Sequence, residues 1–126
     1  VGLTPTDLLN PDAEPRFRPL YDSYLALTLS HLEAGWDYTN SLPRSCLRVR
    51  LACAWPILIG VRTVNRLRVT NVLDASQRVK ITRSEVRNII LQTAGLYFFP
   101  RSWRNLFALT VSAPPLASSL PICTPR

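Results

Sequence analysis

The chain has 126 residues, 47% of them hydrophobic and 18% charged, with a formal net charge of +7. This length fits one domain or a piece of one, and the apolar content is too high for a disordered chain. The basic balance favours an anionic partner, such as a phosphorylated small molecule, nucleic acid or an anionic membrane surface.

The first predicted element is a short helix over residues 3–10, followed by an extended linker over residues 11–19. Thr4 is a good N-cap, and Pro5 suits the first helical position. Pro11 would end this helix, and two further prolines lie in the linker.

A long helix is predicted from about Pro19 to about Asn40, with two apolar lines along it. A helix that is apolar over most of its circumference is usually buried among other helices. Because this chain offers few such neighbours, we expect part of the domain to lie elsewhere. The first line is Tyr21, Leu25, Leu29, Leu32 and Trp36, and the second is Leu20, Tyr24, Leu27, His31, Ala34 and Tyr38.

A second helix is predicted from about Arg44 to about Arg68, with Pro56 well inside it. A proline at such a position removes a backbone hydrogen bond and kinks the helix, at a cost of about 3 kcal/mol. The bend is either simply tolerated or shapes the wall of a cavity. The longest apolar run, Leu51–Val61, is too short to span a bilayer, so no transmembrane helix is predicted, and contact with a membrane surface stays open.

Three predictions cover the rest of the chain. Thr82 and Glu85 match a capping box, which predicts a third helix to about Thr93. Its predicted buried face is Val86, Ile89, Ile90 and Thr93. A short helix is predicted over Arg101–Val111, and the tail over 112–126, rich in proline and serine, is expected to be disordered.

A basic band lies in the centre of the sequence, where no acidic residue occurs between Tyr38 and Leu73. Helical spacing would put four of its arginines on one face of the second helix. Such a face beside apolar residues suits a diphosphate with a hydrocarbon tail. An ordinary solvated face, or pairing with acids outside this chain, is the alternative, and nucleic-acid binding fits less well because no familiar motif is present. The four arginines are Arg44, Arg48, Arg62 and Arg66.

Catalytic groups are sparse. No set of carboxylates has a spacing that would hold magnesium, and Glu33 with Asp37 fits a solvent-exposed strip better than a metal pair. His31, the single histidine, is expected in the core or at its boundary. Three cysteines without metal-type spacing indicate free thiols in a reducing compartment. We therefore expect the chain to bind a diphosphate without being able to ionise it.

Several segments resemble the C-terminal helices of bacterial squalene synthase-like enzymes of the squalene/phytoene synthase family. The resemblance extends over about residues 2–107 and places the chain after both aspartate-rich motifs of the family, neither of which matches any position here. It implies an all-α fold, namely the incomplete C-terminal helices of an isoprenoid-synthase-type bundle over 1–111. The segments are GLTPTDLL (2–9), HLEAGWDY (31–38), Leu42-Pro43, RLACAWPILIG (50–60) and VKITRSEV (79–86).

The resemblance also implies a function and a set of site residues. Family members join two prenyl diphosphates head to head with Mg²⁺, and squalene synthases then reduce the intermediate with NADPH. Farnesyl diphosphate is the implied substrate. Four residues resemble positions of the hydrocarbon cavity, although plain core packing explains them equally well: Tyr38, Ala52, Cys53 and Pro56. Lys80 and Arg83 resemble the segment associated with diphosphate or NADPH, or they form a solvated loop.

The chain is thus predicted to be part of a cytoplasmic transferase that is inactive alone, has no catalytic or metal site of its own and contacts no nucleic acid. The Trp55-Pro56 run favours the squalene branch over the phytoene branch. The alternative is a non-catalytic basic helical module that binds an anionic membrane surface or nucleic acid.

Overall fold

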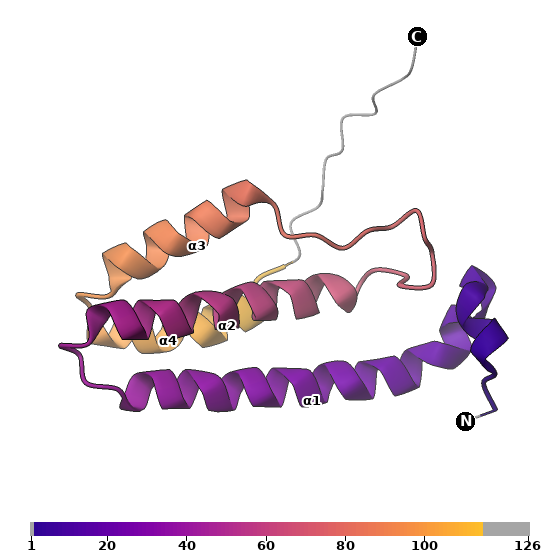
Figure 1. Ribbon diagram of the computed structural model, residues 1–126, viewed down its shortest axis with the longest axis horizontal. Helices are drawn as coiled ribbons and strands as arrows, with labels where there is room; N and C mark the ends of the chain where they lie inside the picture. The colour runs from indigo at the N-terminus through magenta and orange to yellow at the C-terminus, as the bar shows by residue number, and fades with distance from the viewer. Residues whose placement is uncertain (1, 115–126) are drawn as a thin grey trace, which may run out of the picture.

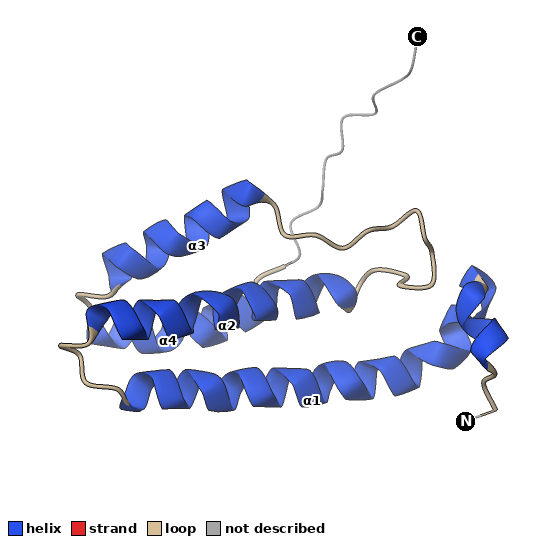
Figure 2. Ribbon diagram, viewed as in Figure 1, coloured by secondary structure: helices blue, strands red, loops and turns tan. Residues whose placement is uncertain are grey.

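The computed structural model describes residues 2–114, and every regular element within this range is helical (Figure 2). Two short 3₁₀ helices, η1 (Pro5–Leu9) and η2 (Pro11–Ala13), precede α1 (Glu14–Ser41), α2 (Leu47–Leu67), α3 (Arg83–Leu96) and α4 (Pro100–Ser112). The predicted all-α fold is confirmed for this part of the chain. The tail predicted to be disordered falls, from residue 115 onward, outside the described residues.

Helix α1 begins earlier than predicted, although prolines occupy two positions near its start. Arg18 holds this end of the helix against the end of α2. Its guanidinium donates hydrogen bonds to the carbonyls of Leu67 (3.3 Å) and Thr70 (3.1 Å). The predicted linker over 11–19 is therefore wrong, because tertiary contacts offset the helix-breaking effect of proline.

Helices α1 and α2 form an antiparallel hairpin, and its register is defined by two glycines (Figure 1). A Cβ at Gly35 would lie 3.3 Å from Ile57, and a Cβ at Gly60 would lie 3.0 Å from Leu32. The two backbones therefore approach closely along this seam. Helix α2 continues through Pro56 as one element, so the proline does not divide it.

Helix α3 lies on the side of α2 away from α1, whereas α4 lies behind α2 in this view and also contacts α1 (Figure 1). The core is formed by buried apolar side chains from all four helices, with Trp36 stacked on Trp103 at 5.3 Å between ring centroids. Of the predicted buried face of α3, Ile89 and Thr93 are buried, whereas Ile90 is exposed. The core residues are Trp36, Ala54, Leu58, Val61, Ile89, Tyr97, Trp103, Leu106 and Phe107.

Side-chain hydrogen bonds hold the start of α3 and the end of α4. Thr82 and Glu85 form the predicted capping box, in which the Thr82 side chain accepts from the Glu85 backbone N–H and Glu85 accepts from the Thr82 backbone N–H. At the far end of α4, the buried Asn65 amide of α2 donates to the carbonyls of Thr110 (2.9 Å) and Val111 (3.2 Å). These bonds satisfy carbonyls that have no partner within their own helix.

Candidate functional site

One apolar line of α1 faces outward. The first predicted line is buried or half-buried, but the second is largely exposed from residue 24 onward. Tyr24 is 61% exposed, Leu27 52% and Tyr38 63%. His31 lies on the same line and is also exposed, so its predicted place in or beside the core is wrong. The helix is amphipathic in this chain because no described element covers its second line.

Helix α2 adds a matching strip. Ala52 and Pro56 are exposed and Cys53 is half-buried. Because Gly35 packs against Ile57 and Gly60 against Leu32, Tyr38 lies opposite residue 54 in the hairpin. The four predicted wall residues therefore lie at about the same position along the length of the two helices. Both strips point away from the core, and we call the surface they form the hairpin face. Its members are Tyr24, Leu27, His31, Ala34 and Tyr38 of α1 and Val49, Ala52 and Pro56 of α2.

The two predicted phosphate-binding residues lie elsewhere. Lys80 is exposed in the connection that precedes α3, and Arg83 is the exposed first residue of α3. The carbonyl of Lys80 accepts a hydrogen bond from Arg66, near the end of α2. Arg66 is 14 residues along α2 from Ala52, which corresponds to about 21 Å at the rise of an α-helix. The structure therefore separates the basic segment from the predicted hydrocarbon wall.

Arg66 itself is paired within the chain. Its Nη2 lies 2.9 Å from both carboxylate oxygens of Glu85, which is buried. Burial alone would raise the pKa of Glu85, but hydrogen bonds from Thr82 and the charges of Arg66 and Arg62 outweigh it, and the pKa lies below its ordinary value. The pair ties α2 to the first turn of α3.

The predicted face of four arginines on α2 is therefore not formed as one free surface. Arg44 precedes the helix, because the chain turns at residues 43–46 before α2 begins at Leu47. Its Nη2 donates to the carbonyl of Tyr97 at 3.4 Å instead. Arg66 is neutralised by Glu85, so the basic band is divided between the two ends of α2.

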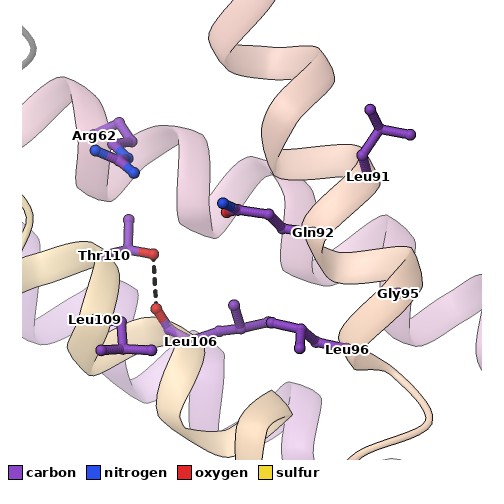
Figure 3. A pocket seen from close by; sticks show the side chains of 8 residues that line it. All are labelled: Arg62, Leu91, Gln92, Gly95, Leu96, Leu106, Leu109 and Thr110. Atoms are coloured by element: carbon purple, nitrogen blue, oxygen red, sulfur yellow. Dashed lines mark hydrogen bonds between the residues drawn. The ribbon is translucent and has the colours of Figure 1, made fainter.

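The structure also contains a cavity of about 440 Å³ between α3 and α4 that no sequence pattern indicated (Figure 3). Its walls are mainly leucines, with Arg62 and Gln92 as polar members. Arg62 of the predicted basic face lines it, but none of the residues that the family resemblance indicated does, and its lining comes from α2, α3 and α4. The lining residues are Arg62, Leu91, Gln92, Gly95, Leu96, Leu106, Leu109 and Thr110.

Neither a cluster of metal ligands nor a membrane-spanning helix is found among the described residues. No group of three or more histidine, cysteine, aspartate or glutamate side chains in residues 2–114 is arranged to hold a metal ion. None of the helices in the described range is long and apolar enough to cross a membrane.

Comparison with known proteins finds a matching protein family. The family model for squalene/phytoene synthase matches residues 1–85. No curated protein and no solved structure matches the chain. The matched region contains the hairpin and ends at Glu85, so the resemblance expected for 86–107 lies outside it. Since this region is more than half of the chain, the protein belongs to the squalene/phytoene synthase family, whose members are prenyltransferase-type enzymes acting on prenyl diphosphates.

Proposed function

We propose that the chain is the C-terminal part of a head-to-head prenyl transferase that condenses two farnesyl diphosphates toward squalene. The hairpin face is the observation that carries this proposal. Four of its side chains are large, apolar and more than half exposed, namely Tyr24, Leu27, Tyr38 and Val49. Contiguous exposed apolar surface usually marks a place where protein or ligand packs. Further helices of the family's bundle would face it across a hydrocarbon cavity.

Within this proposal the residues have separate roles. Tyr38, Ala52, Cys53 and Pro56 contact the prenyl chain, while Lys80 and Arg83 meet the diphosphate or the phosphates of NADPH. Guanidinium and ammonium groups suit that task because they form charge-assisted hydrogen bonds with phosphate oxygens. No residue of the chain is assigned to bond breaking, since its carboxylates do not fit magnesium. The proposed location is the cytoplasm, with peripheral contact to a membrane.

An activity assay tests the proposal that this chain alone is an incomplete enzyme. Residues 1–126 are incubated with farnesyl diphosphate, Mg²⁺ and NADPH, and the extract is analysed for squalene by gas chromatography. We expect none, because the groups that ionise the allylic diphosphate are absent from the described residues. Squalene above the level of a boiled control would refute this part of the proposal.

Protection of a cysteine thiol from alkylation tests whether the predicted wall residues contact the prenyl chain. Cys53 is half-buried beside the hairpin face, whereas Cys46 is exposed in the turn before α2. A non-ionisable farnesyl thiodiphosphate should slow alkylation of Cys53, measured by peptide mass spectrometry, and leave Cys46 unaffected. Equal rates with and without the analogue would contradict the assignment of the wall. If the analogue had no effect on thermal stability, and salt-dependent binding to duplex nucleic acid or anionic liposomes were found instead, the alternative of a non-catalytic basic module would be favoured.

A further inference from the structure

The turn between α1 and α2 lies at the same end of the bundle as the connection between α3 and α4 (Figure 1). A small cavity of about 80 Å³ is lined by residues of these two segments and of the helices beside them. Three guanidinium groups line it, and none of its lining residues is acidic. Aromatic rings form much of the remaining wall. The lining residues are Asn40, Leu42, Arg44, Arg50, Tyr97, Pro100, Trp103 and Arg104.

Arg50 is the buried centre of this cavity. It is only 5% exposed, and its Nε has no hydrogen-bond partner within residues 2–114. The guanidinium carbon lies 5.6 Å from the Tyr97 ring centroid and 5.4 Å from that of Trp103. Such cation–π contacts offset only part of the free-energy cost of burying a charge without a counter-ion. None of the salt bridges in the described part of the chain involves Arg50. The site therefore lacks negative charge.

The neighbouring polar groups are also arranged as donors. The Oδ1 atom of Asn40 accepts from Trp103 Nε1 at 3.0 Å and from Arg50 Nη2 at 3.3 Å, which leaves its amide nitrogen free to donate. Arg44 reaches the carbonyl of Tyr97 only at the long distance of 3.4 Å, and Arg104 has an exposed side chain. An oxyanion in the cavity would accept hydrogen bonds from several of these groups and would offset the charge of Arg50.

We propose that this cavity is a binding site for a phosphate-type oxyanion. The volume suits a group of a few heavy atoms, since one water molecule occupies about 30 Å³ in the liquid. The site is separate from Lys80 and Arg83, because Arg50 and Arg66 are 16 residues, or about 24 Å, apart along α2. It therefore does not depend on the proposed catalytic function.

The surroundings of the cavity allow two sources for the anion. Phe98 and Phe99, 73% and 62% exposed, directly follow the lining residue Tyr97 in the turn between α3 and α4. Exposed aromatic residues beside arginines also fit the interface of an anionic membrane. The oxyanion can thus be free phosphate or the headgroup of an anionic lipid, and the experiment below has one arm for each.

The first arm measures thermal unfolding of the 126-residue chain against inorganic phosphate, with NaCl at matched ionic strength as reference. Wild type should show a saturable rise in Tm. Arg44→Gln/Arg104→Gln removes two exposed lining charges and should weaken phosphate binding at least tenfold. Arg48→Gln/Arg101→Gln makes the same charge change at exposed arginines outside the lining and should behave as wild type. Arg50→Met, if it folds, should abolish the phosphate effect.

The outcomes that overturn the proposal are specific. One is a rise in Tm with NaCl as large as that with phosphate, and the other is an equal loss of phosphate binding in the two double variants. Either result would reduce the effect to general screening of the net charge. The site would also be excluded if phosphate gave no saturable rise in Tm and the chain bound no vesicles in the second arm, which follows.

The second arm measures flotation with vesicles of phosphatidylglycerol and of phosphatidylcholine. Binding to phosphatidylglycerol that is lost in both Arg44→Gln/Arg104→Gln and Phe98→Ser/Phe99→Ser would support the site with a lipid headgroup as its anion. Saturable stabilisation by phosphate without vesicle binding would support it with a free anion. Vesicle binding that persists in Arg44→Gln/Arg104→Gln, without a phosphate response, would refute it.

Discussion

Gly60 and Gly95 lie in helices, but their surroundings differ in a way that decides the effect of adding a methyl group. A Cβ at Gly60 would approach the two methyl carbons of Leu32 at 3.0 and 3.3 Å, whereas a Cβ at Gly95 would meet nothing within 4 Å. Leu32 packs against the core, so it has little freedom to move aside. The close approach of α1 and α2 thus depends on the missing side chain at residue 60.

We expect Gly95→Ala to stabilise the chain by about 0.5–1 kcal/mol, because alanine restricts the unfolded chain and favours the helix. Gly60→Ala should gain less or become destabilising, since the same helical gain is offset by contact with Leu32. Urea unfolding of the two variants measures the difference. A gain at residue 60 equal to that at residue 95 would contradict the close packing of the hairpin.

Glu85 makes stability depend on pH in a defined direction. The pKa of Glu85 is lowered from its ordinary value of 4.5. Its contribution to the free energy of unfolding is therefore fully present above pH 4.5 and is lost as the pH falls through the lowered pKa. Glu85→Gln keeps the capping geometry but removes the charge facing Arg66. At pH 7 it should cost about 1–3 kcal/mol. Urea unfolding should show the difference from wild type shrinking below pH 4.5, and a constant difference would count against the ion pair.

At the scale of single elements, α4 is the helix whose end depends most on another helix. Asn65→Ala removes the donors to the carbonyls of Thr110 and Val111 from a position that is only 7% exposed. Leaving these carbonyls unpaired should cost about 1–3 kcal/mol. Hydrogen exchange should become faster in the last turn of α4. Asn105→Ala, an exposed change on the same helix, should leave that turn protected.

Elements defined by local chemistry could be predicted from the sequence, and those defined by distant contacts could not. The start of α3 was predictable because Thr82 and Glu85 interact within one turn. The start of α1 was not, because Arg18 holds it by bonds to residues about 50 positions away. The placement of Arg44 in α2 was wrong for a related reason, as nothing local distinguishes the turn over 43–46 from a helix start after Pro43.

The whole molecule presents the hairpin face to solvent, and this has a measurable consequence. An apolar dye such as anilinonaphthalene sulfonate should bind the native chain. Tyr24→Ser/Leu27→Ser should lower its fluorescence, because these side chains are 61% and 52% exposed and contribute little to the core. Val69→Ser, at a 67% exposed position outside the face, should leave it unchanged. Equal dye fluorescence in all three proteins would contradict the exposed face.

The sequence could indicate the candidate site only incompletely, for a physical reason. Both apolar lines of α1 satisfy the helical pattern, and only the neighbours of the helix determine that the line of Leu25 is buried and that of Tyr38 is not. The predicted wall residues were indicated by family resemblance. That they lie at about the same position along the two helices follows from the register of the hairpin. The cavity around Arg50 was not foreseen, since its aromatic partners Tyr97 and Trp103 lie about 50 residues later.

The stacked indoles of Trp36 and Trp103 make the core optically distinctive. The two rings are 5.3 Å apart with an interplanar angle of 27°, and both residues are almost completely buried. Their electronic transitions are close enough to couple, which should give paired bands in the near-ultraviolet circular dichroism. This signal reports the docking of α4 on α1, whereas far-ultraviolet dichroism reports helix content alone. Comparing the two during unfolding would show whether the helices separate before they melt.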